Sequence, residues 1–285
     1  MSRSISVSEW TKNDVRNSLP DRAAESHKGT FGIALLVAGS EDMPGAAILS
    51  GLGAMRSGLG KLAIATDEAV VSHIVSTLPE ATYVRNGRYL LSKNEMELSQ
   101  YRSIAVGPGL PEDGETRAAV ERLLKAEVPV VLDAGAIGGR SYEERNSPTI
   151  LTPHPGEFAR MTGKSIGEIE NNRASLVSEW AQRLGVTIVL KGYNTLTSFA
   201  DGSVYKNSTG NSSLAKGGSG DVLTGMILGM LCCNKSWKYA VLNAIYLHGA
   251  CADYWVKKRS AHSLLAHEIS ELLPEVWADV ETSQS

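Results

Sequence analysis

Short runs of apolar residues recur along the chain and alternate with longer stretches whose apolar positions repeat every three or four residues. The short runs are typical of strands buried on both faces, and the longer stretches are typical of helices. Their repeated alternation predicts an α/β fold with a mostly parallel sheet and helices on both of its faces. The predicted strands are 32–40, 62–65, 81–84, 103–106, 128–132, 149–151 and 186–190, and the predicted helices are 45–58, 68–78, 115–126, 165–184, 238–257 and 262–273.

One hairpin and the two ends of the chain depart from this alternation. Asp201-Gly202 lies between two short apolar runs, which predicts an antiparallel hairpin at one edge of the sheet. Residues 1–26 read as a polar lead with a short helix after Trp10, and residues 279–285 are expected to form a disordered tail. No repeat, linker or shift in composition divides the chain, so residues 1–285 are expected to form a single domain.

Composition narrows the classes of function. The 28 Lys and Arg residues against 31 Asp and Glu residues give a formal net charge of -3, with no basic stripe, so neither nucleic acid nor an anionic membrane is an expected partner. No stretch is apolar for the ~20 residues that a membrane span needs, and the first residues lack a signal-like apolar segment. A cytoplasmic location is therefore expected. The 3 cysteines lack disulfide-framework and zinc-ligand spacing and are interpreted as core thiols.

A glycine-rich turn leads directly into an apolar helix at residues 217–231. Gly217-Gly218-Ser219-Gly220 can turn successive backbone N–H groups toward one point, which the positive end of the helix dipole also faces. This combination predicts an anion hole for a phosphate group. Asp221, at the junction, has two interpretations. It either caps the helix or acts as a general base that deprotonates a hydroxyl beside the bound phosphoryl group.

Further candidate residues follow the ends of predicted strands, where sheets of this kind bind ligands. Asp133 either holds a hydrated Mg²⁺ or caps a turn. His154 lies between two prolines that fix an extended backbone, which suits a substrate contact, although a lone histidine is more often structural. Glu157, in the first turn of the next helix, either favours the helix dipole or binds Mg²⁺ through water. Lys191 ends a buried strand before a glycine, which fits a phosphate or nucleotide neighbourhood or a simply solvated lysine.

Two helical features have interpretations that need no chemistry. The predicted helix 45–58 carries a face of small residues that includes Ala46, Gly51 and Gly53. Such a face favours close packing, or else the close approach of a ligand or of another subunit. His248, on an apolar helix and without metal-ligand spacing to other histidines, is interpreted as a packed histidine.

The order of the motifs is more specific than any one of them. Ala-Gly-Ser (38–40), Gly-Pro-Gly-Leu (107–110), Leu-Asp-Ala (132–134), Thr-Pro-His-Pro-Gly-Glu (152–157), Leu-Lys-Gly (190–192) and Gly-Gly-Ser-Gly-Asp-Val-Leu (217–223) follow one another along the chain. This order resembles that of the ADP/ATP-dependent NAD(P)H-hydrate dehydratase family, part of the ribokinase-like superfamily, from about His27 to Leu273. The resemblance implies a ribokinase-like three-layer sandwich with a mostly parallel central sheet.

The resemblance implies the repair of damaged nicotinamide cofactor. The (S)-form of NADH hydrate (NADHX) or NADPH hydrate (NADPHX) is phosphorylated on its added hydroxyl by ADP or ATP, and phosphate then leaves. Position by position, Asp221 would be the catalytic base and the backbone of residues 217–220 the anion hole. The nucleotide-binding residues implied are Lys191, Gly192, Tyr193, Asn194, Thr195 and Gly220, and the hydrate-binding residues are Ala46, Gly109, His154 and Asp221.

The same resemblance implies Mg²⁺ as cofactor, ADP or ATP as the phosphoryl donor with ADP favoured in a stand-alone chain, a separate NAD(P)H-hydrate epimerase as functional partner, and a homotetramer. Two stretches differ from the usual family pattern. Ser212-Ser213 stand where relatives often carry Pro-Gly, with Lys216 before the glycines, and Ala266-His267-Glu268 stand where relatives often carry Ala-Ser-Asp. These differences affect loop geometry and nucleotide contacts.

Two other functions stay open at this point. One is a ribokinase-like kinase of a small molecule such as a vitamin precursor. The other is a non-catalytic nucleotide-binding module in which Asp221 only caps its helix.

Overall fold

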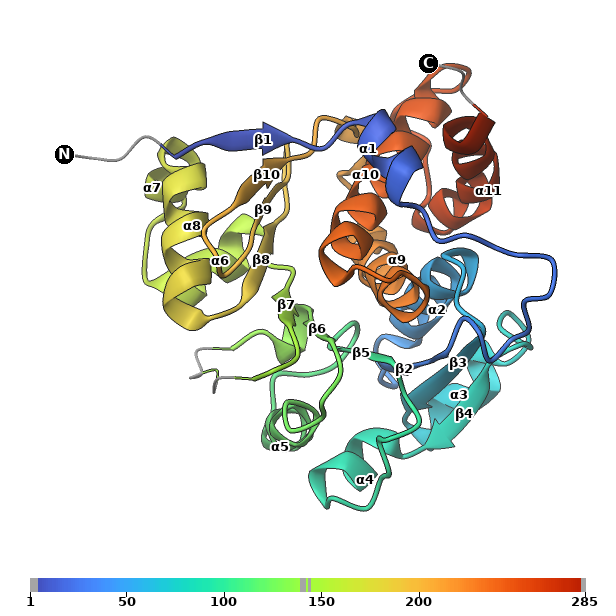
Figure 1. Ribbon diagram of the computed structural model, residues 1–285. Helices are drawn as coiled ribbons and strands as arrows, with labels where there is room; N and C mark the ends of the chain where they lie inside the picture. The colour runs from blue at the N-terminus through green and yellow to red at the C-terminus, as the bar shows by residue number, and fades with distance from the viewer. Residues whose placement is uncertain (1–4, 139–141, 143–144, 283–285) are drawn as a thin grey trace.

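The computed structural model describes residues 5–138, 142 and 145–282, and the strands described form one sheet (Figure 1). The strand order is β1-β10-β9-β8-β7-β6-β5-β2-β3-β4. The strands are β1 (Val7–Glu9), β2 (Ile33–Val37), β3 (Lys61–Thr66), β4 (Thr82–Arg85), β5 (Ser103–Val106), β6 (Val130–Leu132), β7 (Thr149–Leu151), β8 (Thr187–Leu190), β9 (Leu196–Ser198) and β10 (Val204–Lys206).

The sheet is mostly parallel, as the apolar pattern predicts. Strand β9 is antiparallel to both β8 and β10, which confirms the predicted hairpin, whereas the other neighbouring pairs described are parallel. The chain order reverses between β2 and β5, which lie side by side although β3 and β4 come between them in sequence. Such a switch point leaves a crevice beyond the carboxyl ends of the two strands.

The amino-terminal lead differs from its prediction. Strand β1 pairs in parallel with β10, where Val7 is opposite Val204, and so forms the outer edge of the sheet (Figure 1). Its three residues are all exposed, so no apolar run marks this strand in the sequence. The expected short helix is present as α1 (Lys12–Ser18). Residues 1–4 of the lead lie outside the described residues.

Helices cover both faces of the sheet because alternate residues of each strand point to opposite faces. In β2, Leu36 packs in one apolar cluster and Leu35 in the other. The first cluster is covered by α1, α2 (Pro44–Arg56), α3 (Glu68–Ile74), α9 (Ser219–Cys233), α10 (Trp237–Val256) and α11 (Ala266–Thr282), and the second by α4 (Gly87–Ser92), α5 (Gly114–Leu123), α6 (Pro155–Thr162), α7 (Ile166–Asn171) and α8 (Arg173–Leu184). This arrangement is the expected three-layer sandwich.

The small-residue face of α2 serves close packing against α9. A methyl group on Gly53 would lie 2.4 Å from the carbonyl oxygen of Val222, and one on Gly225 would lie 1.9 Å from that of Ser50. The two helix backbones are therefore in direct contact, and only glycine fits at these positions. This contact sets the position of α9, and with it the position of the glycine-rich turn that precedes the helix.

Two helical predictions need correction. The predicted helix 165–184 is divided at Asn172 into α7 and α8, although its capping box is present, with Ser165 and Glu168 bonded to each other's backbone N–H groups. The tail predicted to be disordered from residue 279 instead continues α11 to Thr282. Val280 is buried there, in step with the apolar residues of the preceding turns. Residues 283–285 lie outside the described residues.

The described helices include none that is long and apolar enough to cross a membrane.

Candidate active site

The glycine-rich turn has the geometry of an anion hole. Gly218 is the N-cap of α9 and adopts the left-handed conformation, with φ of 90°. The backbone N–H groups of Gly217, Gly218 and Gly220 donate no hydrogen bond to any other described residue, whereas Ser219 N donates to Lys216 O at 3.4 Å. Unpaired N–H groups at the positive end of a helix dipole favour a bound anion. These unpaired N–H groups are what the anion-hole prediction requires.

Asp221 does not cap the helix. The N-cap is Gly218, so Asp221 is the third residue of α9, and its carboxylate accepts no hydrogen bond from the described residues. The capping interpretation is wrong because the helix begins earlier than the glycine pattern suggests. Burial, and secondarily the charge of Asp133, raise the pKa of Asp221 to about 7, while Lys191 acts in the opposite direction. A half-buried carboxyl that titrates near neutrality suits general-base chemistry.

Lys191 and Asp133 form a buried ion pair beside this carboxyl. Lys191 Nζ lies 2.8 Å from Asp133 Oδ1 and 4.0 Å from Glu157 Oε2. Burial lowers the pKa of Lys191, but the charges of Asp133, Glu157 and Asp221 outweigh burial and raise it above its ordinary value. A methyl group on Gly220 would lie 3.4 Å from this ammonium, so Lys191 Nζ lies next to the glycine-rich turn 217–220, called the anion turn below. Lys191 is therefore not the solvated lysine of the alternative interpretation.

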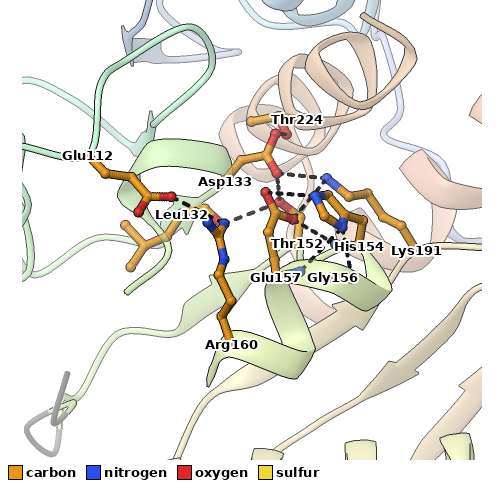
Figure 2. A network of polar contacts seen from close by, with 10 residues as sticks. All are labelled: Glu112, Leu132, Asp133, Thr152, His154, Gly156, Glu157, Arg160, Lys191 and Thr224. Atoms are coloured by element: carbon orange, nitrogen blue, oxygen red, sulfur yellow. Dashed lines mark hydrogen bonds and ion pairs between the residues drawn. The ribbon is translucent and has the colours of Figure 1, made fainter. Parts of the chain in front are cut away.

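Asp133 also differs from its turn-cap interpretation. Its side chain makes no capping hydrogen bond to the short helix η1 (Ala134–Ala136). Instead its carboxylate accepts hydrogen bonds from the side chains of Thr152, Lys191 and Thr224 (Figure 2).

His154 and Glu157 hold each other at the start of α6. His154 is the N-cap, and its Nδ1 accepts hydrogen bonds from the backbone N–H groups of Gly156 at 3.0 Å and Glu157 at 3.3 Å. Glu157 Oε2 accepts the His154 backbone N–H at 2.7 Å. Because Nδ1 accepts, the neutral ring carries its proton on Nε2, and the exposed imidazole lines the cavity next to the anion turn. His154 thus combines the structural and the ligand-facing interpretations.

A cavity of about 590 Å³ brings together all six of the predicted nucleotide-binding residues. Its walls include Lys191 to Thr195 after β8, His154, and Ser219 and Gly220 of α9. The Tyr193 side chain is 82% exposed at this cavity. Arg173 of α8 holds the backbone of the segment 191–195, since its guanidinium donates hydrogen bonds to Tyr193 O at 2.9 Å and to Leu190 O at 3.3 Å.

The opposite wall is a loop that α10 holds, and sequence reasoning did not identify its anchors. Most residues of the loop 207–216 line the cavity. Asp253 of α10 accepts hydrogen bonds from Gly210 N at 2.8 Å and Asn211 Nδ2 at 2.9 Å. A methyl group on Gly249 would lie 2.3 Å from Thr209 Oγ1, so the loop rests directly on the helix. The serines that depart from the family pattern occur in this loop, as part of η2 (Ser212–Leu214).

His248 has a role beyond packing. Burial lowers the pKa of His248 to about 4, so the ring is neutral at physiological pH. Its Nε2 lies 2.9 Å from the carbonyl oxygen of Ser219, and the ring also lines the cavity. The interpretation as a packed histidine is confirmed, and the contact with Ser219 adds a link between α10 and the anion turn.

The predicted hydrate-binding residues Ala46 and Gly109 meet at the switch point of the sheet. Gly109 has φ of 68°, and a methyl group on it would lie 2.7 Å from Ala46 Cβ. Gly39 N donates to Pro108 O at 2.9 Å, which ties together the loops after β2 and β5. Neither Ala46 nor Gly109 lines the 590 Å³ cavity, so the structure places them apart from the nucleotide segment.

Two further observations bear on alternative sites. A larger, shallow hollow of about 820 Å³ lies between β1, β10 and α8, and none of the predicted site residues lines it. Among the described residues, no group of three or more His, Cys, Asp or Glu side chains is arranged to hold a metal ion.

Comparison with known proteins places this geometry in context. A family model described as NAD(P)H-hydrate dehydratase matches residues 34–275. The ADP-dependent (S)-NAD(P)H-hydrate dehydratase of Bacillus subtilis strain 168 is 58% identical over 273 residues, which cover 96% of this chain and 99% of that protein. The bifunctional NAD(P)H-hydrate repair enzyme Nnr of Moorella thermoacetica is 34% identical, and the chain spans 53% of its length.

Solved structures agree with the sequence relatives. The ADP/ATP-dependent NAD(P)H-hydrate dehydratase from Bacillus subtilis, co-crystallized with ATP/Mg²⁺, superposes with a TM-score of 0.95 at 57% identity, covering 98% of this chain and all of that one. A hydroxyethylthiazole kinase from Pyrococcus horikoshii superposes with a TM-score of 0.54 at 15% identity over 93% of this chain, a likeness of fold alone.

Proposed function

The chain belongs to the NAD(P)H-hydrate dehydratase family, and on this premise we propose that it repairs nicotinamide cofactor through the chemistry of Asp221 and the anion turn. The reaction is the ADP-dependent dehydration of (S)-NADHX or (S)-NADPHX to NADH or NADPH. A single observation carries the proposal. A carboxyl with a pKa of about 7 directly follows a glycine turn with unpaired N–H groups and lies within the field of a buried lysine.

In the first step, Asp221 takes the proton of the added hydroxyl while that oxygen attacks the terminal phosphorus of the donor. The new O–P bond forms as the bridging P–O bond breaks, and the donor leaves with one phosphate fewer. The backbone N–H groups of residues 217–220 and the Lys191 ammonium stabilise the charge on the transferring phosphoryl group. Each such donor contributes about 3 kcal/mol to transition-state stabilisation.

In the second step, the phosphorylated hydrate loses phosphate. The C–O bond breaks, a proton leaves the neighbouring carbon, and the double bond of the dihydronicotinamide ring is restored. The anion turn that accepted the phosphoryl group is also placed to stabilise the departing phosphate.

The donor set fits a magnesium ion carried by the nucleotide. Asp133, Glu157 and Asp221 all act on the single ammonium of Lys191, so negative charge is in excess where an anionic donor must bind. Mg²⁺ prefers carboxylates and phosphate oxygens and keeps several waters. Glu157, through water, and the donor phosphates would hold the ion, which would neutralise phosphate charge.

Assembly and location extend this proposal. We propose a homotetramer, a cytoplasmic location and a separate epimerase partner that supplies the (S)-form of the hydrate. Residues 1–285 would act as one ribokinase-like domain. The family resemblance supports the tetramer, the location and the partner. The single domain is supported by the described strands, which run from Val7 to Lys206 and form one sheet. Light scattering of the purified chain tests the tetramer.

The direct test of function is incubation of the purified chain with NADH hydrate, Mg²⁺ and either ADP or ATP while NADH absorbance is followed. Recovery of NADH with ADP supports the dehydratase. No recovery with either nucleotide, together with phosphorylation of another small alcohol, would instead identify the chain as a kinase.

A further inference from the structure

One buried carboxylate lies at the centre of the polar contacts behind the site. Asp133 is 2% exposed and follows β6. Its Oδ1 accepts hydrogen bonds from Thr152 Oγ1 at 2.8 Å and Lys191 Nζ at 2.8 Å, and its Oδ2 accepts one from Thr224 Oγ1 at 2.8 Å. Figure 2 shows these three side chains converging on Asp133 from different segments of the chain.

Each of the three donors belongs to a segment that carries a residue of the proposed site. Thr152 is joined through Pro153 to His154, and Lys191 itself stands over the anion turn. Thr224 lies one helical turn after Asp221 on α9, on the same side of the helix. The sequence separations to Asp133 are 19, 58 and 91 residues, so no local structure brings these segments together.

We propose that Asp133 is the positioning residue of the active site, which fixes Lys191, the His154 segment and the base-bearing helix α9 in one arrangement through its three hydrogen bonds. Asp133 touches no reacting atom in this role and acts through the residues that it holds. The inference rests on the proposed function, because the reaction requires the three segments to keep fixed positions relative to one another.

The chemistry of the contacts explains why a carboxylate is needed. Three donors converge, one of them an ammonium, and an ionised carboxylate can accept all of them. An asparagine at this position keeps the shape but replaces one acceptor oxygen with a donor, so it would oppose either Lys191 or Thr224. Thr224 can turn its hydroxyl to accept from the amide, whereas Lys191 cannot accept, so the amide oxygen would face Lys191 and Thr152. The neutral amide would then leave the Lys191 ammonium without its balancing negative charge, and a hydrogen bond to a neutral acceptor holds an ammonium less strongly than one to a carboxylate.

The same contacts contradict the turn-cap interpretation of Asp133 and leave its oxygens less available to magnesium than those of Glu157. Its side chain caps no turn, and both of its oxygens already accept hydrogen bonds from protein donors. Glu157 is the better candidate for a water-mediated magnesium contact. Its Oε1 forms no hydrogen bond with the described donors, and His154 Nε2 lies 3.6 Å away, beyond hydrogen-bond distance.

A double-mutant cycle tests the role. We expect Asp133→Asn to lower kcat/KM by about 100-fold, the loss that misplacing catalytic groups by about 1 Å can cause. Lys191→Met should cause a similar loss. If Asp133 acts largely through Lys191, the double variant should be little worse than Lys191→Met alone, because contacting residues in one network are not additive. Fully additive losses in kcat/KM would overturn the proposal, and so would an Asp133→Asn variant whose kcat/KM is within twofold of the wild-type value.

A matched pair at Thr224 separates positioning from general destabilisation. Thr224→Ser keeps the hydroxyl and should retain activity within about threefold, whereas Thr224→Val keeps the shape, loses the hydrogen bond and should lower kcat. The melting temperature of each variant is measured alongside its activity. Equal activity of the Ser and Val variants would contradict the link between Asp133 and α9.

The pH profile provides a readout that a merely structural residue would not move. Asp133 and Lys191 are the charged groups whose fields act on Asp221, and Glu157 faces Lys191 from α6. Removal of the Asp133 charge should shift the acidic limb of kcat/KM to lower pH. An unchanged limb in Asp133→Asn would count against the inference.

Two measurements keep this inference distinct from the proposed function. Absence of NADH recovery by the wild-type chain would remove the proposed function. Calorimetric binding of ADP, which needs no turnover, still reports on Asp133. Weaker ADP binding by both Asp133→Asn and Lys191→Met, measured at a temperature where each variant is still folded, is the expected result, and wild-type binding by Asp133→Asn would contradict the inference.

Discussion

The two sides of the site are built differently. The nucleotide side is an open cavity of about 590 Å³, walled by loops and by a Tyr193 side chain that is 82% exposed. The side behind the anion turn is closed, with Asp133 2% exposed and bonded to three segments. Loops on an open cavity can adapt to a ligand, whereas buried charged networks hold one geometry. Substitutions on the closed side should therefore lower turnover as well as donor binding, whereas those on the open side should weaken donor binding alone.

The largest effect is expected at Asp221, on the closed side. Asp221→Asn should lower kcat by about 10²- to 10⁴-fold, because the variant cannot accept the hydroxyl proton. Stability should not fall. Burial raises the pKa of Asp221 in the folded chain to about 7, so ionisation above the unfolded value of 3.8 opposes folding, and a neutral amide removes that opposition. Steady-state assays and thermal unfolding at neutral pH check both parts, and wild-type turnover would contradict the base.

Lys191, which lines the open cavity and pairs with Asp133 on the closed side, should be next in effect. Lys191→Met should lower kcat/KM by about 10²- to 10³-fold through loss of phosphoryl stabilisation. It should also destabilise the fold by about 3–5 kcal/mol, because Asp133 would stay buried without its ammonium. Lys164→Met is the matched control, since Lys164 is exposed and pairs with Glu168 at 3.5 Å. Equal effects of the two substitutions on turnover would contradict the role of Lys191 in stabilising the phosphoryl group.

On the open side, Gly249 tests the loop wall. In Gly249→Ala the new methyl group would lie 2.3 Å from Thr209 Oγ1 and push the loop from α10. We expect KM for the donor to rise about tenfold, with a loss of about 1–3 kcal/mol in stability from overpacking. Gly167→Ala, where a methyl group meets nothing within 4 Å, is the control and should be neutral or slightly stabilising. An unchanged KM in Gly249→Ala would show that the loop does not shape the donor site.

The smallest effect is expected at Tyr193. Tyr193→Ala should raise KM for the donor about fivefold at unchanged kcat, if its exposed ring stacks on the nucleobase with the lower end of base–aromatic stacking energies. Tyr193→Phe should behave like the wild type. Tyr89→Ala, at another exposed tyrosine outside the cavity, controls for loss of an aromatic side chain. A fall in kcat rather than a rise in KM would place Tyr193 with the closed side.

The comparison also explains which features the sequence could predict. Buried parallel strands leave continuous apolar runs, so the central sheet was predictable, whereas the exposed β1 leaves no such run. The glycine turn and His154 were predictable because each depends on its own neighbours in sequence. The Asp133 contacts were not, since Thr224 is 91 residues away and is an ordinary residue of an apolar helix. The sequence left Asp221 as either a cap or a base, because the glycine pattern does not show that the left-handed Gly218 starts the helix before Asp221.

The central claim is that Asp221 is a base with a pKa near neutrality. Its most direct test is the pH dependence of kcat/KM for the hydrate, measured with the donor saturating as its magnesium complex so that the donor phosphates stay ionised. The account predicts a tenfold fall per pH unit below a pH of about 7, where Asp221 becomes protonated. A rate that stays flat down to a pH of about 5, near the ordinary carboxyl range, would contradict it.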